Sequence, residues 1–215
     1  MSELKDDIYI AIDGTRRCSW CGDNELYQSY HDHEWGQPVG EDRDLFEKLC
    51  LESFQSGLSW LIILRKREAF RQAFANFEMK RVAQFDDEDI ARLMANTGIV
   101  RNRQKIAATI NNAARALEIV EEFGSLAAFI WQYEPDEHSL PKRLTRKTIP
   151  KTIPEATRMA KDLKSRGFRF LGPVTTYSLM EAMGLVNNHM QDCDFRLKIK
   201  RARDEFRRPK VGEKL

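Results

Sequence analysis

The stretch Leu49–Trp60, with the sequence LCLESFQSGLSW, places one carboxylate where a helix should be apolar. Leu45, Leu49 and Glu52 are spaced by four and then three residues, so in a helix they share one face. Burying an ionisable group in such a face costs free energy unless it is paired, and burial raises the pKa of a carboxyl group. Glu52 is therefore a candidate functional residue.

The residues after Glu52 predict a break between two helices. Gly57 ends the first helix, Ser59 can cap the second, and Trp60 opens it. This turn can bring the flat indole ring of Trp60 back toward the carboxylate. The alternative is that Glu52 pairs with a lysine or arginine from elsewhere in the core, and this stretch alone leaves both interpretations open.

Outside this stretch, apolar residues recur at helical spacing and no sustained alternation indicates strands. Helices are expected over 60–77, 86–96, 101–123, 126–133, 154–167 and 174–183. The chain is predicted to be all-α. Residues 134–154, rich in proline and charge, predict a surface loop or a hinge between two helical lobes.

Composition limits the class of protein. The chain has 215 residues, of which 42% are hydrophobic and 32% charged, which is typical of a soluble globular protein. It has no run of about 20 apolar residues and its N-terminus is acidic, so we expect a cytoplasmic protein without a signal peptide. In that compartment its four cysteines are expected to be thiols or metal ligands.

The two ends differ from the middle of the chain. Residues 1–16 predict a loose N-terminal arm, and residues 17–195 form the predicted principal domain. Residues 196–215 carry a net charge of +6, which predicts a solvated basic tail. Because the rest of the chain is slightly acidic, a nucleic-acid partner would have to meet local basic patches such as Arg101–Lys105 and Arg169.

Cysteines and histidines gather in two distant segments. Six residues could bind zinc, which takes four sulfur or nitrogen ligands: Cys18, Cys21, His31, His33, His189 and Cys193. If the second segment is helical, His189 and Cys193 share a face. Chance placement of these residues is the alternative, and Cys50 is interpreted as a small core residue.

Residues 168–173 connect two predicted helices through a short turn that contains Gly172. Such a helix-hairpin-helix exposes backbone N–H groups at the start of its second helix, where they and the helix dipole favour a phosphate. A generic turn between helices is equally compatible with this segment.

Taken together, these motifs resemble the DNA-3-methyladenine glycosylase I family of the helix-hairpin-helix glycosylase superfamily. The resemblance rests on blocks that lie in order between residues 17 and 195: Arg17-Cys18-x-Trp20, Tyr30-His31-Asp32-x-Glu34-Trp35-Gly36, 51–60, 98–106, 166–173 and Gly184-Leu185-Val186-Asn187-x-His189-x-x-x-Cys193.

The resemblance implies one structural zinc ion held by Cys18, His31, His189 and Cys193. Such an ion would fasten the N-terminal segment to the C-terminal segment without an open position for catalysis. Cys21 and His33 stay alternatives, since either could replace a neighbour.

The resemblance also assigns a pocket for a flipped base. It implies Glu52 as the catalytic carboxylate, Tyr30 and Trp60 as the pocket walls, and Trp20 and Tyr27 as further lining. A methylated purine joined to its sugar is cationic, so aromatic rings and a carboxylate favour it over adenine. Packing of these aromatic residues in the core is the alternative.

Four residues are expected to contact DNA: Leu58, Arg101, Arg169 and Gly172. Leu58 would fill the gap left by the flipped base. Pro173 stands where a lysine would be needed for Schiff-base chemistry, which predicts a monofunctional enzyme that leaves an abasic site. Asp192 is a weaker catalytic candidate.

The expected function is hydrolysis of the N-glycosidic bond of 3-methyladenine in alkylated double-stranded DNA. We expect a monomer with no membrane partner and no organic cofactor. One alternative is a zinc-containing helical module that binds damaged DNA without cutting it, for which Glu52 would have little use. A second is an enzyme for another lesion, such as alkylated guanine.

Overall fold

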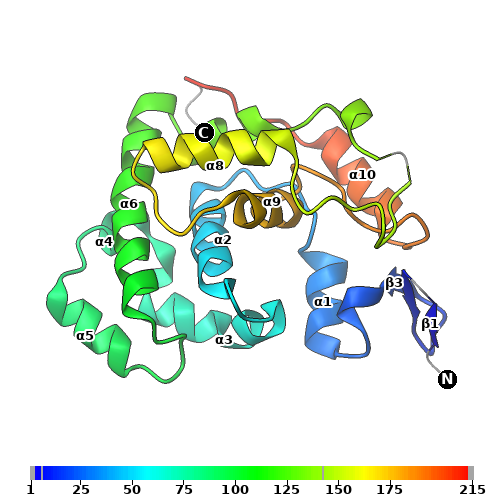
Figure 1. Cartoon of the computed structure of the whole chain (residues 1–215), viewed down its shortest axis with the longest axis horizontal. Coiled ribbons are helices and arrows are strands. Elements are labelled where there is room, and N and C mark those ends of the chain that lie inside the picture. The colour runs from blue at the N-terminus through cyan, green and yellow to red at the C-terminus, as the bar shows by residue number, and fades with distance from the viewer. Residues whose placement is uncertain (1–2, 6, 142, 213–215) are drawn as a thin grey trace.

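The computed structural model describes residues 3–5, 7–141 and 143–212, most of which lie in helices (Figure 1). The helices are α1 Glu25–His33, α2 Asp42–Gln55, α3 Trp60–Ala73, α4 Met79–Val82, α5 Asp87–Ala95, α6 Arg103–Phe123, α7 Leu126–Ile130, α8 Pro154–Ser165, α9 Pro173–Ala182 and α10 Arg196–Glu205. Short 3-10 turns occupy Ser19–Cys21, Ala75–Phe77, Trp131–Tyr133 and Glu137–Ser139. The predominantly helical fold predicted from the sequence is confirmed.

The N-terminal segment is not a loose arm. It forms a three-stranded antiparallel sheet of β1 Glu3–Lys5, β2 Ile8–Ile10 and β3 Arg16–Cys18, in that order. Ile8 pairs with Cys18 in the register and is buried with Met190 and Cys193. Strands of three residues are too short for a detectable alternation, so the sequence pattern missed them.

Helix α2 runs through the centre of the molecule (Figure 1) and is buried from Leu45 to Phe54. Helices α3, α6, α7 and α9 pack against it. It ends before Gly57, whose φ of +85° is readily adopted only without a side chain. Ser59 occupies the N-cap position of α3 but makes no capping hydrogen bond with its side chain, so that part of the prediction was wrong.

Three of the other predicted helix starts have side-chain caps. Asp86 forms a capping box with Asp89, Asn102 accepts from the Lys105 backbone, and Ser125 accepts from Ala128. The helix predicted over 60–77 ends at Ala73 and continues as a 3-10 turn in which Asn76 is left-handed. From residue 134 to residue 153 the described chain is irregular except for Glu137–Ser139.

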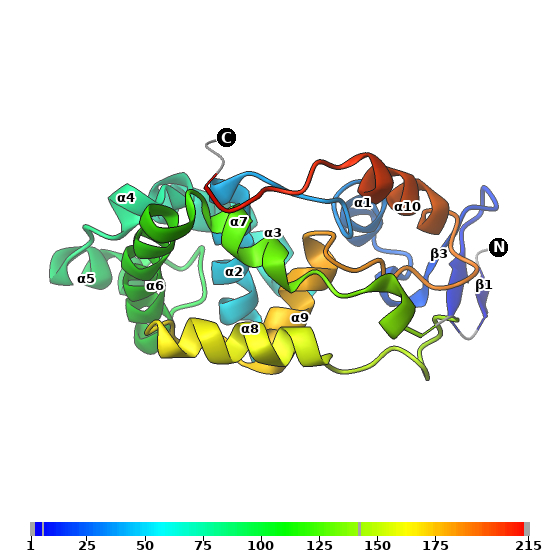
Figure 2. The same cartoon turned by 90° about the horizontal axis from the view of Figure 1, so that it is seen from above.

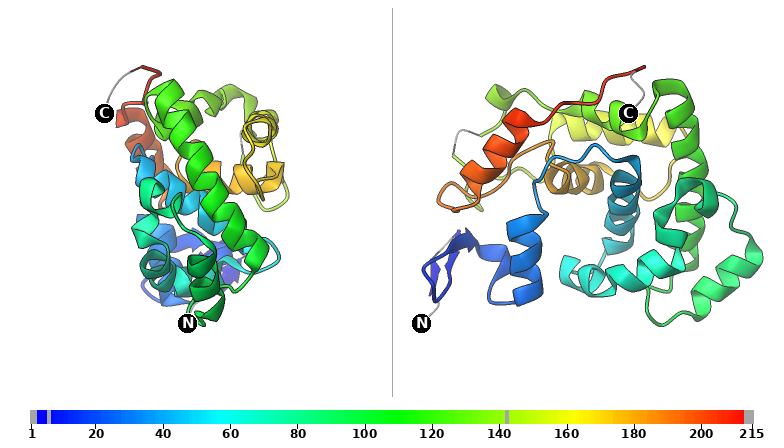
Figure 3. Two further views of the ribbon diagram at one scale, coloured as in Figure 1. Left: turned by 90° about the vertical axis from the view of Figure 1, so that its left-hand side faces the viewer. Right: turned by 180° about the vertical axis from the view of Figure 1, so that it is seen from behind.

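Helices α8 and α9 lie side by side, as Figures 2 and 3 show from two directions. Pro154 is the first residue of α8 and Pro173 the first residue of α9. Gly167, just after the C-terminal end of α8, has a φ of +87°. The connection between them is held on α6, because the side chain of Asn112 accepts from the Arg169 backbone N–H at 2.8 Å and donates to the Arg169 carbonyl at 3.0 Å.

The basic C-terminal segment is also ordered, contrary to the expected solvated tail. Residues 196–205 form α10, which buries Ile199 and lies close to α1, where Lys198 donates to the Asp32 carbonyl at 3.4 Å (Figure 2). Arg203 donates to Glu134 at 2.8 Å. The segment stays ordered because its basic side chains bond to residues of the rest of the protein. The placing of domain boundaries after residue 16 and after residue 195 stays a prediction.

The segment that contains His189 and Cys193 is not helical. Residues 187–195, which would have aligned His189 and Cys193 as a helix, form a loop with turns instead. None of the helices in the described residues is long and apolar enough to cross a membrane.

Candidate functional site

Glu52 points into the protein interior, as the helical spacing predicted. It lies on the buried face of α2 with Leu45 and Leu49, and only 5% of its surface is exposed. Burial raises the pKa of Glu52 to about 7, and the nearby positive charge of Lys48 limits that rise. The carboxyl group is therefore poised to change its charge near neutral pH.

The partner that the sequence left open is Lys48, one turn earlier in the same helix. Its Nζ lies 3.9 Å from a Glu52 carboxylate oxygen and donates a hydrogen bond to the Tyr30 hydroxyl. It also lies over two aromatic rings, 3.8 Å from the Trp60 ring centroid and 4.5 Å from the Tyr30 ring centroid. Burial lowers the pKa of Lys48 to about 8.

Sequence reasoning missed Lys48, although its spacing of four residues from Glu52 was a usable signal. The ion pair between Lys48 and Glu52 is weak, because no hydrogen bond joins the two side chains. The ammonium group of Lys48 also lies over the Tyr30 and Trp60 rings. The paired-core interpretation therefore describes only part of the environment of Glu52.

A cavity of about 210 Å³ opens beside Glu52. Its volume is below the range of pockets for drug-sized ligands, which suits one flat ring system. All five residues predicted to line a base pocket line this cavity: Trp20, Tyr27, Tyr30, Glu52 and Trp60. The structure adds four that the sequence did not indicate: Trp35, Gln55, Ser178 and Glu181.

Two features of the cavity wall indicate a place for a polar aromatic ligand. Trp60 is 92% buried, and its buried indole Nε1 has no hydrogen-bond partner among the described residues. The Tyr30 and Trp60 rings lie 5.5 Å apart, and Trp20 meets Tyr27 edge to face at 4.9 Å. These aromatic residues therefore line a cavity and also pack in the hydrophobic core, and their role in holding a base stays a prediction.

Glu181 is a second carboxyl group at the same cavity, and it comes from α9. Its Oε1 accepts a hydrogen bond from the Asn188 amide at 2.8 Å. Burial raises the pKa of Glu181 to about 7, while the Asn188 bond opposes that rise. The sequence signal was a lone acid among the apolar residues of 179–183.

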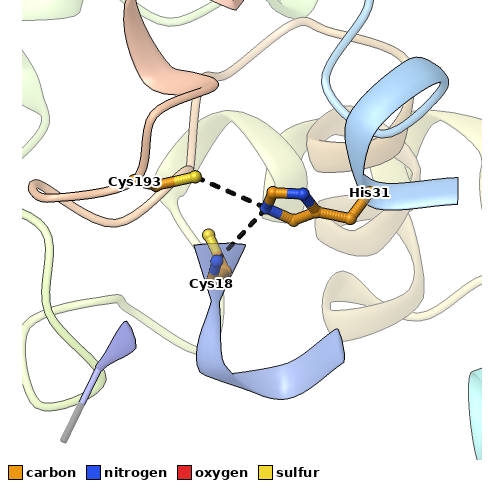
Figure 4. A group of neighbouring side chains, drawn as sticks. All are labelled: Cys18, His31 and Cys193. Carbon is orange, nitrogen blue, oxygen red and sulfur yellow. Dashed lines mark hydrogen bonds between the residues drawn. The ribbon is translucent and has the colours of Figure 1, made fainter. Parts of the chain in front are cut away.

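The second polar site joins both ends of the chain. Cys18, His31 and Cys193 are all buried, and one ligand atom from each lies within 4.8 Å of the others (Figure 4). Cys193 Sγ lies 3.5 Å from His31 Nε2, and the Cys18 backbone N–H also approaches that nitrogen at 3.3 Å (Figure 4).

His189 lies next to this cluster. Its ring centroid is 4.8 Å from that of His31, it is fully buried, and its Nε2 has no hydrogen-bond partner among the described residues. Burial lowers the pKa of His189 to about 3, so its imidazole is neutral and its ring nitrogen can act as a ligand.

A set of supporting bonds orients His31. Asp32 accepts from His31 Nδ1 at 2.8 Å, which leaves Nε2 facing the cysteines. Arg17 in turn donates to both oxygens of Asp32 at 2.7 to 2.9 Å.

The two alternative ligands lie outside this set. The Cys21 thiol donates to the Cys18 carbonyl at 3.1 Å, and burial raises its pKa to about 12. His33 is exposed at the end of α1 and lines a different cavity. Asp192 is exposed in the loop before Cys193 and does not line the cavity beside Glu52.

The predicted DNA contacts are all on the surface. Arg169 and Gly172 line a broad groove of about 850 Å³ at the hairpin, together with Lys161 and Lys164. Leu58 is 38% exposed at the turn after α2, and Arg101 is exposed before α6.

One residue of the predicted Arg101–Lys105 patch is not available to DNA. Lys105 is buried and donates to the carbonyls of Phe54 at 2.9 Å and Ser56 at 2.7 Å, which closes the C-terminal end of α2.

Comparison with known proteins agrees with this geometry. Residues 20–197 match the model of the methyladenine glycosylase family. The chain is 39% identical over 182 residues to a DNA-3-methyladenine glycosylase of Haemophilus influenzae, covering 83% of this chain and 97% of that protein. It is 40% identical over 177 residues to DNA-3-methyladenine glycosylase 1 of Escherichia coli, covering 82% and 95%.

Solved structures show the same similarity. A crystal structure of 3-methyladenine DNA glycosylase I superposes with a TM-score of 0.78 at 42% identity, covering 83% of this chain and 98% of that one. A structure from Staphylococcus aureus, described as the structural basis of 3-methyladenine recognition, gives a TM-score of 0.78 at 42% identity, covering 84% and 96%. The resemblance seen in the sequence motifs is confirmed, and the chain belongs to the methyladenine glycosylase family.

Proposed function

We propose that this protein is a DNA-3-methyladenine glycosylase, which hydrolyses the N-glycosidic bond of 3-methyladenine in alkylated duplex DNA. The similar proteins of known name are 3-methyladenine glycosylases, and one solved relative is a tyrosine variant in complex with 3-methyladenine. The observation that carries the proposal is Glu52, an ionisable group in a small cavity walled by aromatic rings.

This cavity favours a cationic base over a neutral one. A base methylated at N3 and still joined to its sugar carries a positive charge. The ring faces of Tyr30 and Trp60 and the ionised carboxylate of Glu52 attract that charge, and both attractions strengthen where water is excluded. Adenine gains neither, so selectivity follows from charge as well as from shape.

The chemical step needs little help from the protein. A methylated purinium is a good leaving group, and the C1′–N9 bond can break through an oxocarbenium-like state. Glu52 then stabilises the bound cationic base instead of attacking the sugar. Lysine is absent from the described lining of the cavity, and Lys48 contacts the rings from a neighbouring cavity, which supports a monofunctional enzyme that leaves an abasic site.

The cysteine and histidine cluster fits one zinc ion. Two sulfur and two nitrogen donors from Cys18, His31, His189 and Cys193 match the preference of zinc, and the unpartnered Nε2 of buried His189 is the observation that supports a missing partner. A zinc ion at this cluster would hold the segment 18–31 against the segment 189–193. The ion would be structural, because the catalytic groups belong to the other site.

The DNA surface comprises Leu58, Arg101 and the hairpin with Arg169 and Gly172. These residues are exposed, and the cations among them would meet phosphates, so binding should weaken steeply with salt and depend little on sequence. The protein is proposed to act as a monomer. The substrate places the reaction in the cytoplasm with the DNA.

Base release from methylated duplex DNA tests the proposal. The intact protein should free 3-methyladenine, identified by chromatography, and Glu52→Gln should slow release by about a hundredfold or more. Glu121→Gln changes an exposed glutamate on α6 and serves as the matched control. An intact protein that binds the DNA but frees no base would instead support a damage-binding module, and release of another base would reassign the substrate.

A further inference from the structure

Two carboxyl groups line the base cavity, but only one ammonium group among the described residues lies close to them. Glu52 from α2 and Glu181 from α9 both line it, and the negative charge of Glu52 adds to the burial that raises the pKa of Glu181. The cation beside Glu52 is Lys48, at 3.9 Å.

The other titratable groups around this site do not balance the second carboxylate. Burial raises the pKa values of Tyr27 and Tyr177 to about 12 and that of Tyr30 well above its ordinary value, so all three are neutral near pH 7. Arg67 of α3 pairs with Glu34. Among the described residues that face the two carboxyl groups, Lys48 is therefore the principal cation.

Glu181 is held in place without being neutralised. The Asn188 amide donates to Glu181 at 2.8 Å and to the Tyr177 hydroxyl at 2.7 Å, and Asn188 itself is 2% exposed. A neutral amide fixes the orientation of a carboxylate but cannot compensate its charge. Glu52 is buried and Glu181 is partly buried, and two carboxylates near one another in such surroundings cannot both ionise readily without a second cation.

We propose that Glu181 is a second specificity-determining carboxylate of the base cavity, for which the cationic base is the missing counter-ion. Lys48 balances one carboxylate, and the incoming base balances the other. Entry of the cation therefore ionises the carboxyl pair fully, and the displaced proton passes to solvent. This inference rests on the proposed function, because it assumes that a methylated purinium occupies the cavity.

A second carboxyl group makes the cavity bind neutral adenine more weakly than a cationic base. A neutral base leaves the carboxyl pair partly protonated, so it gains no Coulomb attraction from the second group. The raised pKa values of Glu52 and Glu181, both about 7, mean that the pair still holds a proton near neutral pH. A nearby cation lowers those pKa values, so binding at about pH 6.5 must release protons.

Calorimetry on the intact protein tests proton release without any substitution. The ligand is 3,9-dimethyladeninium, which is permanently cationic, and its control is 9-methyladenine, which lacks the N3 methyl group and is neutral at about pH 6.5. Binding heats in two buffers of different ionisation enthalpy give the protons released. We expect release with the cation at about pH 6.5, none with 9-methyladenine, and little with either at about pH 9. Equal release with both ligands, or none with the cation, would overturn the proposal.

Glu181→Gln tests the residue itself. Glutamine keeps an oxygen that can accept from Asn188, so the orientation of the side chain is preserved while the charge is removed. We expect cation binding to weaken about tenfold, binding of 9-methyladenine to change less than about twofold, and proton release to fall. Glu121→Gln is the matched control.

The outcomes separate this inference from the proposed function. If the intact protein binds neither ligand and frees no base, the base cavity itself has been misassigned. If the intact protein prefers the cation and frees 3-methyladenine while Glu181→Gln weakens both ligands equally or neither, the glycosylase proposal stands and the role of Glu181 is wrong.

Discussion

The cysteine and histidine cluster and the base cavity are both polar sites inside a helical protein, but they are organised in opposite ways. Around the cluster, His31 is oriented by Asp32, which is fixed by Arg17, and the donor atoms converge on one point. At the cavity, Glu52, Lys48 and Glu181 converge on no common partner, and the Trp60 indole nitrogen has none. Converging donors suit a resident ion, whereas unbalanced charge beside a cavity suits a ligand that comes and goes.

The strongest test of the difference is Cys193→Ser, which removes one donor from the cluster. We expect zinc to fall from about one ion per chain to near zero, and the free energy of unfolding to fall by about 3 kcal/mol or more, because the proposed ion would tie distant segments together. Elemental analysis and thermal unfolding measure both. Cys21→Ser is the matched control and should keep its zinc; loss of zinc there would show that the donor set is wrong.

A smaller effect is expected from Asp32→Asn, which leaves all four proposed zinc donors in place. Because Asp32 orients His31 through Nδ1, its loss should weaken zinc binding by about 10- to 100-fold, measured by competition with a chelator. Asp194→Asn, which alters an exposed ion pair with Arg16 near the cluster, provides the control. With zinc restored, base release by Asp32→Asn should match the intact protein, and a persistent defect would mean that the two sites are not independent.

At the base cavity, Lys48→Met should change the pH dependence of base release. The charge of Lys48 lowers the pKa of Glu52, so its removal raises that pKa above about 7 and leaves more Glu52 protonated at neutral pH. We expect release to slow about tenfold at about pH 6.5 and to recover at about pH 9. Single-turnover rates across pH measure the shift, with the exposed Lys80→Met as control. An equal loss at every pH would mean that Lys48 acts only by holding Tyr30.

The smallest effect is expected from Asp192→Asn. Asp192 lies in the sequence beside Cys193 but is exposed and does not line the base cavity. Base release and zinc content should both change less than about twofold, because surface substitutions away from special features have small effects. A large loss of base release would restore Asp192 as a catalytic residue.

Much of the fold could be predicted because its signals are local. The spacing of Leu45, Leu49 and Glu52 fixes which face of α2 is buried, and Asp86, Asn102 and Ser125 cap helices where the pattern placed their starts. The failures were segments whose order depends on distant partners. The β1–β3 sheet packs Ile8 against Met190, and α10 is held by Glu134.

The same distinction applies to the candidate sites. Glu52, the aromatic residues and the candidate metal ligands could be recognised from residue type and spacing alone. The chemical groups of a site are properties of side chains, and the sequence gives every side chain directly. Only the tertiary structure brought Cys18 beside Cys193, placed Glu181 across from Glu52, turned Lys48 onto two rings and withdrew Lys105 from the surface. Those outcomes depend on contacts between helices, and the pattern within one helix does not specify which charges its neighbours will present.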